Sequence, residues 1–225
     1  MNGTGHSLIP NFMSSLPKVI FLSSTPAGKK LLVWLKELPC QIVLAETDDR
    51  KLTAFPPCDV AFGYLYTHRI PESEFVVPYR WVNFHPGPLP EMRGRNLAYH
   101  AIMQGRPTFG ATIHYMDRAF DTGEIIETVH FPIEPGHTAG DLVHLSHKVL
   151  QSLFKKYAPL LLRGKIPSAP QAAGQYYKKE SIKDEVDLTE AQARLVRAVT
   201  VAPRFHAKVS IGGRIYNLVP EEIRA

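Results

Sequence analysis

The stretch from Arg80 to Ile126 constrains this chain more than any other, and its densest part is the run Val82-Asn83-Phe84-His85-Pro86-Gly87-Pro88-Leu89-Pro90. An apolar segment carries an Asn and a His with one residue between them, and prolines and a glycine then stop it. If residues 80–85 form a strand, Asn83 and His85 project from the same face, because side chains alternate along a strand. Open α/β sheets hold their ligands outside the carboxyl ends of parallel strands. The run therefore predicts a site at the edge of a sheet.

The N-terminal part of the chain predicts the sheet itself. A short apolar strand is expected at residues 18–22, followed by a helix that Thr25 caps and Pro26 starts. Further strands are expected at residues 41–45 and 59–64. This order is typical of a parallel sheet covered by helices. The first strand-to-helix turn contains neither G-x-G-x-x-G nor a P-loop, so neither NAD nor ATP is indicated.

The segment after the central run predicts two more strands joined by a loop. Asn96 is placed to cap a helix that ends at Gly105. Alternating residues predict a strand over 108–116, with His114 filling the strand end, and another strand over 124–131. The connecting loop can bring Asp121 back over the edge toward which the Asn and the His point.

The C-terminal third predicts a long helix and then a small extension. The helix is expected at residues 141–162. Thr189-Glu190-Ala191-Gln192 forms a capping box for a short helix, and the runs 206–211 and 214–219 flank a Gly-Gly pair that favours a hairpin. The predicted organisation is a flexible tail (residues 1–16), a core (17–170) and a short extension with helix and hairpin (171–225).

Composition limits the class of protein. The 225 residues include 44% hydrophobic ones, which suffices for a buried core, and the formal net charge of +5 suits a phosphate-bearing substrate as well as nucleic acid. No Lys/Arg cluster is dense enough to indicate nucleic acid, and no apolar stretch is long enough to span a membrane. Two cysteines and a polar N-terminal segment without signal-peptide character favour the cytoplasm.

The ten histidines do not predict a metal site. His144 and His147 stand at helical spacing, but they lie on the long helix whose buried face is marked by Leu145, Val149 and Leu153. We therefore expect no bound metal.

Several short motifs follow one another along the chain, beginning with the central Asn and His. They are Asn83-Phe84-His85-Pro86, Leu89-Pro90, Arg93-Gly94, Ala101-Ile102, Gly105, Gly110-Ala111-Thr112-Ile113-His114 and Asp121-Thr122-Gly123-Glu124-Ile125-Ile126. This ordered set closely resembles the formyltransferases that use N10-formyltetrahydrofolate, a family that includes the glycinamide ribonucleotide, methionyl-tRNA and sugar N-formyltransferases. The resemblance implies an α/β fold with a Rossmann-like formyltransferase core, N10-formyltetrahydrofolate as co-substrate, and Asn83, His85 and Asp121 as catalytic residues.

These residue types suit formyl transfer to an amine. When the amine attacks the formyl carbon, the formyl oxygen becomes an oxyanion that needs a donor already in place. A charged His85 and the amide N–H of Asn83 can both donate to it. An Asp121 that lies against His85 would favour the charged imidazole, and the two residues would relay a proton from the amine to the folate. For Asp121 the plainer reading is an Asx-type turn, and both readings can hold together.

By resemblance, the pterin is bound by the segment before the central strand and by the loop that ends at Asp121. The predicted co-substrate contacts are Thr67, His68, Arg69, Ile70, Met116, Phe120 and Asp121. The predicted contacts with the acceptor are Tyr64, Pro88, Arg93, Asn96 and Arg204.

The predicted acceptor rests on two features of other members of this family that the sequence lacks. The G-x-G-S-N turn of the glycinamide ribonucleotide enzymes is missing, and too few residues follow the C-terminal helix for the β-barrel of the methionyl-tRNA enzymes. The helix and hairpin resemble those of the compact sugar N-formyltransferases. We therefore expect a homodimer that formylates a nucleotide-linked amino-deoxysugar, of the dTDP-4-amino-4,6-dideoxyglucose type, for glycan or O-antigen (lipopolysaccharide) synthesis. Gly87, usually Ser, and Met92, usually aromatic, leave the shape of the acceptor pocket open.

Three alternatives stay open at this point. The chain could formylate methionyl-tRNA or another amine, it could be a non-catalytic folate-binding relative, or it could be a basic RNA-binding domain that delivers an aminoacyl acceptor. The intact Asn83, His85 and Asp121 argue against the second of these.

Overall fold

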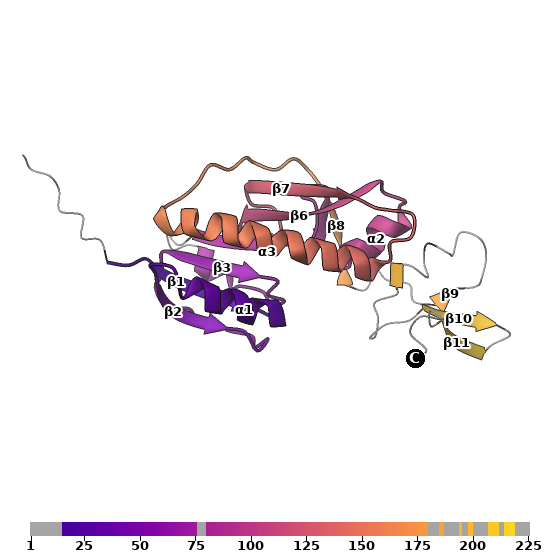
Figure 1. Cartoon of the computed structure of the whole chain (residues 1–225), viewed down its shortest axis with the longest axis horizontal. Coiled ribbons are helices and arrows are strands. Elements are labelled where there is room, and N and C mark those ends of the chain that lie inside the picture. Colours follow the sequence, from indigo (N-terminus) through magenta and orange to yellow (C-terminus); the bar gives the residue numbers. More distant parts are fainter. Residues whose placement is uncertain are drawn as a thin grey trace, which may run out of the picture.

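The computed structural model describes residues 15–75, 80–179, 185–186, 194, 198–199, 207–211 and 214–218. The described core is a mostly parallel sheet flanked by helices, as the sequence predicts (Figure 1). The strand order is β2-β1-β3-β4-β6-β7. The strands are β1 (Lys18–Ser23), β2 (Gln41–Glu46), β3 (Val60–Tyr64), β4 (Arg80–His85), β6 (Thr108–Tyr115) and β7 (Ile125–Pro132). The first four strands pair in parallel, whereas β6 and β7 are antiparallel to their neighbours.

The first helix begins as its capping residue predicts. Helix α1 (Pro26–Leu35) has Pro26 in its first turn, and the side chain of Thr25 accepts a hydrogen bond from the backbone N–H of Gly28. Proline loses nothing at this position, because the first N–H groups of a helix have no partner within it. Leu31 and Leu35 are buried, so this helix packs against the sheet.

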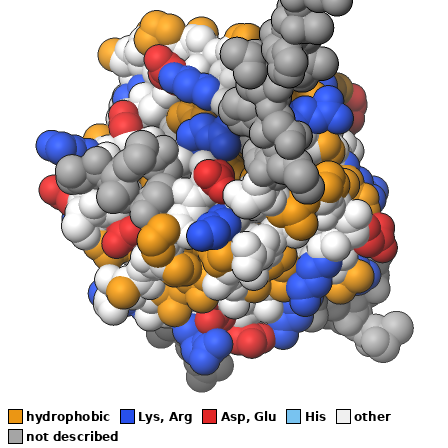
Figure 2. All heavy atoms as spheres, turned by 90° about the vertical axis from the view of Figure 1, so that its left-hand side faces the viewer, with side chains coloured by type: hydrophobic (Ala, Val, Ile, Leu, Met, Phe, Trp, Pro, Cys, Tyr) orange, Lys and Arg blue, Asp and Glu red, His pale blue; other side chains and the backbone are white. Residues whose placement is uncertain are grey.

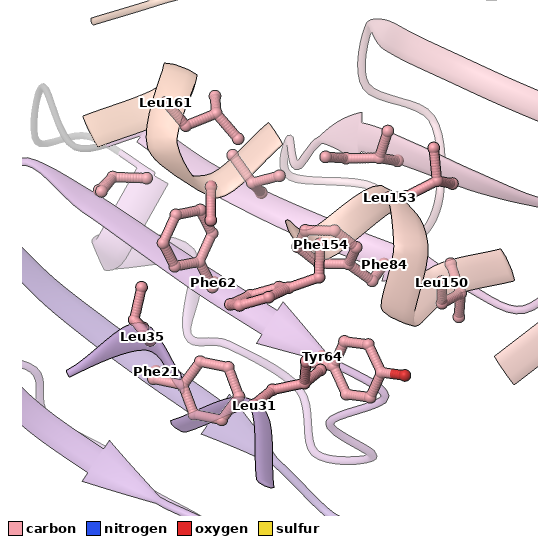
Figure 3. Packing of buried hydrophobic residues seen from close by; sticks show 14 of the residues in the cluster. Phe21, Leu31, Leu35, Phe62, Tyr64, Phe84, Leu150, Leu153, Phe154 and Leu161 are labelled. Carbon is pink, nitrogen blue, oxygen red and sulfur yellow. The ribbon is translucent and has the colours of Figure 1, made fainter. Parts of the chain in front are cut away.

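One face of the sheet is covered by α1 and by the long helix α3 (Ala139–Arg163). Figure 3 shows the ring of Phe154 from α3 among the sheet residues Phe21, Phe62 and Phe84, and the ring centroid of Phe154 lies 5.1 Å from that of Phe84. The side chain of Thr138 accepts a hydrogen bond from the N–H of Asp141, whose carboxylate accepts one from the N–H of Thr138. This capping box fixes the start of α3, which is slightly longer than predicted.

The other face of the sheet carries a separate apolar cluster. Ile20, Leu22, Ala61, Ile70 and Trp81 are buried there. Alternation along β4 places Val82 and Phe84 toward α3, so Asn83 and His85 lie on the opposite face, as Trp81 does. The 3₁₀ helix η1 (Glu72–Phe75) lies on this side, and the carbonyl of Glu74 accepts a hydrogen bond from the indole N–H of Trp81.

A third cluster surrounds the short helix α2 (Leu97–Met103). It contains the start of α3 and the strand β8 (Gln175–Tyr177), which pairs in parallel with β5 (Met92–Gly94). Neither of these short strands is predicted from the sequence, because a three-residue strand shows no usable alternation. They matter for the site, since β5 follows directly on the proline-rich loop.

The C-terminal extension contains the predicted hairpin. Strands β10 (Ala207–Ile211) and β11 (Arg214–Leu218) pair antiparallel, with Ile211 opposite Arg214. A further strand, β9 (Glu185–Val186), pairs in parallel with β10 and was not predicted. The predicted capping box at residues 189–192 lies outside the described residues, although residues 198–199 are helical.

The face that Figure 2 shows carries both positively and negatively charged side chains, and neither kind forms a continuous patch. Lys and Arg side chains alternate there with Asp and Glu, and apolar side chains are scattered among them. Within the described residues, no helix has both the length and the apolar character that a membrane crossing requires.

Candidate active site

The central strand ends where the sequence predicts, and its last residues are brought beside a neighbouring strand. Strand β4 ends at His85, and its antiparallel pairing with β6 places Asn83 directly opposite His114. Directly opposed residues of an antiparallel pair project from the same face. Asn83, His85 and His114 therefore gather on one face at the end of the sheet.

The loop between β6 and β7 returns Asp121 to the same place. Asp121 has a φ of 57°, in the left-handed region that Asp tolerates better than most residues. The carboxylate of Asp117 accepts hydrogen bonds from the hydroxyl of Thr122 and the N–H of Ala119, which fastens the loop. The side-chain amide of Gln171 donates to the carbonyls of Asp121 and Gly123. The loop is thus held from within and from the segment after α3.

The predicted catalytic residues meet at one carboxylate oxygen. Oδ1 of Asp121 lies 3.4 Å from Nδ1 of His85 and 3.4 Å from Nδ2 of Asn83. It also lies 3.7 Å from Nε2 of His114. The other oxygen, Oδ2, accepts a hydrogen bond from the N–H of Gly94 at 2.9 Å. A proton donor, an amide and a carboxylate therefore converge on one small region at the sheet edge.

The second ring nitrogen of His85 fixes its tautomer. Nε2 of His85 lies 2.9 Å from the carbonyl oxygen of Met92. A carbonyl oxygen only accepts, so Nε2 carries a hydrogen and donates it. Nδ1 is then the nitrogen that faces Asp121 and can hold or release a proton there. The side chain of His85 is 4% exposed, which keeps this exchange largely away from bulk water.

His114 orients the amide of Asn83. Nδ1 of His114 donates to the carbonyl of Tyr115 at 2.7 Å, so Nε2 carries the lone pair of a neutral ring. That lone pair accepts from Nδ2 of Asn83 at 3.1 Å. Complete burial lowers the pKa of His114, an effect that outweighs the attraction of Asp121 for the charged form. The neutral ring therefore keeps the amide nitrogen of Asn83 directed at Asp121.

The four side chains open into a large cleft. Its volume is about 1260 Å³, which exceeds the usual range of a site for one small ligand, about 300–1,000 Å³. Asn83, His85, His114 and Asp121 all line it. The cleft has room for two substrates that meet at this group of residues.

Comparison with protein families gives a match to part of the chain. The model of the family described as formyl transferase matches residues 59–156, a span that contains all four of these side chains. This match supports the resemblance to formyltransferases for that part of the chain.

The proteins to which this chain is similar differ in length and in the acceptor that their names give. The methionyl-tRNA formyltransferase of Bacillus mycoides is 32% identical over 148 residues, which are 66% of this chain and 44% of that protein. The chain thus spans less than half the length of such curated relatives. A 4-N formyltransferase from Francisella tularensis superimposes with a TM-score of 0.80 over 92% of this chain and 98% of that one, at 19% identity. That similarity shows the fold.

One solved structure is more similar in sequence. The formyltransferase PseJ from Anoxybacillus kamchatkensis, in complex with UDP-4,6-dideoxy-4-formamido-L-AltNAc and tetrahydrofolate, is 26% identical. The TM-score is 0.62, and the match covers 72% of this chain and 86% of PseJ.

The residues predicted to hold the pterin all line the cleft. They are Thr67, His68, Arg69, Ile70, Met116, Phe120 and Asp121. The guanidinium carbon of Arg69 lies 5.5 Å from the centre of the Phe120 ring, so the two segments approach each other at the cleft. The carbonyl of Thr67 accepts a hydrogen bond from Arg95, and its N–H donates to Ser24. Their contact with a pterin stays a prediction.

Some of the residues predicted to contact the acceptor line the cleft, and others do not. Asn96 lines the cleft, but its φ is 58° and its side chain donates to the carbonyl of Lys179 instead of capping α2. Three others are not among the residues that line the cleft. Tyr64 is fully buried with its hydroxyl directed at the carbonyl of His147, Pro88 is buried in the loop, and Arg93 donates to the segment 171–172. Arg204 lies outside the described residues.

Several groups at the site are not predicted from the sequence. His114 was placed at a strand end, yet it contacts Asn83 directly. The carbonyl of Met92, the N–H of Gly94 and the side chain of Gln171 also position the residues that are predicted to be catalytic. Backbone groups leave no signal in side-chain identity, and Gln171 lies about fifty positions from its partners, so only the fold brings them together. In the described part of the chain no group of His, Cys, Asp and Glu could hold a metal ion.

Proposed function

We propose that this chain transfers a formyl group from N10-formyltetrahydrofolate to the amino group of a nucleotide-linked amino-deoxysugar. The observation that carries the proposal is the convergence of His85 Nδ1, Asn83 Nδ2 and Asp121 Oδ1 in a cleft of about 1260 Å³. This is the set of residues that formyl transfer requires, a donor for an oxyanion and a group that accepts a proton.

The co-substrate would supply an activated formyl group bound to N10. In the transfer, the amine forms a bond to the formyl carbon, the bond from that carbon to N10 breaks, and one proton of the amine reaches N10. Asn83 has two N–H groups, and the longer contact, at 3.4 Å to Asp121, is the weaker one. That N–H, and the Nδ1–H that His85 has when its ring is charged, can donate to the formyl oxygen as negative charge develops on it.

Asp121 completes the proton path. Its Oδ1 lies between the two donors, whereas Oδ2 is held by the N–H of Gly94. One oxygen is therefore fixed and the other is free to exchange a proton with His85. The side chain of Asp121 is 13% exposed, so a single bound amine can reach it from the cleft.

Two further observations support the sugar class of acceptor. The fold matches a compact 4-N formyltransferase over 98% of that chain, and PseJ, 26% identical, was solved with a formylated nucleotide sugar and tetrahydrofolate. The identity to methionyl-tRNA formyltransferases makes methionyl-tRNA the second candidate, although the match covers only 44% of such a protein. The homodimer, the cytoplasmic location and a role in lipopolysaccharide synthesis stay predictions.

Formyl transfer to a panel of acceptors tests the proposal. The panel contains dTDP-, UDP- and GDP-linked 4-amino and 3-amino sugars, methionyl-tRNA and glycinamide ribonucleotide, with N10-formyltetrahydrofolate as donor. We expect turnover on at least one nucleotide sugar, seen as a formylated product by mass spectrometry. His85→Asn serves as the inactive control and His130→Asn, on the exposed side of β7, as the matched surface control.

The outcomes separate the candidates. Turnover on methionyl-tRNA alone, with binding that weakens steeply as salt rises, would replace the sugar by the second candidate. Folate binding without turnover on any amine would indicate a non-catalytic relative.

A further inference from the structure

The segment of residues 65–70, which is predicted to hold the pterin, leaves β3 through a strained residue. Leu65 has a φ of 53°, in the left-handed region that a leucine adopts only where neighbouring contacts hold it. Contacts of this kind come from the loops after β1 and β2. The N–H of Thr67 donates to Oγ of Ser24 at 3.1 Å, and Oγ1 of Thr67 donates to the carboxylate of Asp49 at 2.9 Å. Because β1 and β2 lie on the far side of β3 from β4, these contacts fasten the segment on the side away from the residues predicted to be catalytic.

Arg95 holds the same segment from the other side of the cleft. Its Nη2 donates to the carbonyl of Thr67 at 2.7 Å, which is the length of a strong hydrogen bond from a charged donor. Both residues line the cleft. In the described part of the chain, no other hydrogen bond joins residues 66–70 to β4, to β5 or to the loop between β6 and β7. The spacing of the two sides of the cleft therefore depends on this contact and on that of Arg69 with the ring of Phe120.

The backbone that carries Arg95 is fixed to Asp121. The N–H of the preceding residue, Gly94, donates to Oδ2 of Asp121 at 2.9 Å. The N–H of Arg95 donates to the carbonyl of Tyr177 at 2.9 Å, which continues the pairing of β5 with β8. A Cβ atom on Gly94 would lie 2.1 Å from this same carbonyl oxygen, so only a glycine allows the two strands to approach so closely. Two successive residues therefore connect the Asp121 carboxylate with the segment predicted to hold the pterin.

We propose that Arg95 is a positioning residue that aligns the formyl group of the co-substrate with Asp121. This inference rests on the proposed function, in which N10-formyltetrahydrofolate is the donor, and it adds a residue that acts through Thr67 and not on the reacting atoms. A pterin bound by residues 65–70 takes its place from the Arg95 contact, and Asp121 takes its place from Gly94. One piece of backbone thus aligns the donor with the residues that act on it.

Arg95→Met tests the inference, because methionine keeps a long unbranched side chain but has no N–H group. Arg95 is exposed, so the change leaves no cavity and the urea midpoint should stay the same. We expect kcat to fall about tenfold, since a reacting group misplaced by about 1 Å can cost about 10²-fold in rate. The KM for N10-formyltetrahydrofolate should rise about 3- to 10-fold because its segment is no longer preorganised, while the KM for the acceptor stays the same.

Titration with tetrahydrofolate, followed by calorimetry without any acceptor, measures the same effect on binding alone. The Kd of Arg95→Met should rise about 3- to 10-fold over that of the wild type. The experiment is repeated at low and at high salt, because salt screens a general attraction between Arg95 and the carboxylates of the folate. A hydrogen bond that acts through Thr67 is not screened in this way, so the difference in Kd should persist at high salt.

Arg95→Lys and Arg163→Met are the matched controls. Lysine restores a charged N–H donor of similar reach, so Arg95→Lys should recover most of the kcat and of the affinity for tetrahydrofolate. Arg163 is exposed at the end of α3 and does not line the cleft, so Arg163→Met should equal the wild type. Should Arg95→Met not fold, Arg95→Gln carries the same test, because its shorter side chain does not reach the carbonyl of Thr67.

The results separate this inference from the proposed function. Wild-type kcat and Kd in a folded Arg95→Met protein would overturn the role of Arg95 and leave sugar formylation standing. The same holds for a difference in Kd that vanishes at high salt, or for a rise in KM confined to the acceptor, since Arg95 would then contact a ligand directly. Transfer to methionyl-tRNA alone would overturn the sugar acceptor, while the tetrahydrofolate titration would still test Arg95. A wild-type protein that binds no tetrahydrofolate would overturn both.

Discussion

The amide nitrogen of Asn83 lies 3.1 Å from Nε2 of His114, and the two residues stand directly opposite each other on β4 and β6. Since Nδ1 of His114 donates to the carbonyl of Tyr115, the ring can only accept at Nε2 while it is neutral. The histidine therefore decides which way the Asn83 amide points. An amide turned by half a rotation would present its oxygen to Asp121 and lose its use as a donor.

The first prediction concerns this orientation. His114→Phe retains a buried ring but removes the acceptor, so the Asn83 amide is no longer held. We expect kcat to fall about tenfold or more and the free energy of unfolding to fall by about 1–3 kcal/mol, the cost of an unpaired buried polar group. Steady-state kinetics and urea unfolding measure the two effects. His130→Phe, at an exposed position of β7, is the control, and unaltered turnover in a folded His114→Phe protein would contradict the role.

The second prediction concerns the carboxylate at the centre of the group. Asp121→Asn leaves one oxygen, which can still accept from the N–H of Gly94, but it places an amide nitrogen toward His85 and Asn83. We expect kcat to fall at least about tenfold, because a positioned group that transfers a proton contributes about 10²–10⁴-fold to catalysis, with the urea midpoint unchanged. Asp48→Asn is the control, because Asp48 is exposed and pairs with Lys29 away from the cleft. Near-wild-type turnover would remove Asp121 from the mechanism.

The third prediction concerns the packing of Gly87 against Leu97. Gly87→Ser adds atoms where Leu97 already lies, and we expect a loss of about 1–3 kcal/mol in the free energy of unfolding. Leu97→Ala leaves a cavity and should cost about 2–5 kcal/mol. In the double variant the serine occupies part of that cavity, so the combined loss should fall short of the sum by about 0.5–3 kcal/mol. Urea unfolding of the four proteins measures this coupling, and additive losses would show that the two sites are independent.

The sequence predicted the parts of the fold that have strong local signals. The capped start of α1 at Thr25 and the strand that ends at His85 were placed within a residue or two, because a cap and a proline-rich stop leave clear marks. The convergence of Asn83, His85 and Asp121 was expected from the resemblance, and the structure brings them together at a single oxygen atom.

The remaining site residues depend on pairings that no local pattern encodes. His114 meets Asn83 only because β6 runs antiparallel to β4 in one register, and a shift by one residue would turn it away. Tyr64 is predicted to contact the acceptor because it lies near the site in the sequence, but alternation along β3 turns its ring into the core beneath α3. Arg93 is positively charged and lies near the site in the sequence, yet its guanidinium donates hydrogen bonds to the side-chain oxygen of Gln171 and the carbonyl of Ala172.

The last prediction is that the fold loses stability as pH falls below 6.5. Burial lowers the pKa values of His100, His114 and His147 from their ordinary value of 6.5. Between 6.5 and the lowered value, the unfolded chain binds a proton that the folded one does not, so the free energy of unfolding decreases toward acid by up to about 1.4 kcal/mol per pH unit for each histidine. Urea unfolding from pH 7.5 to 5 measures the slope. His114→Phe should reduce it, whereas His130→Phe, at an exposed position, should not. A slope that is the same in His114→Phe and in the wild type would show that His114 is not held neutral by the fold.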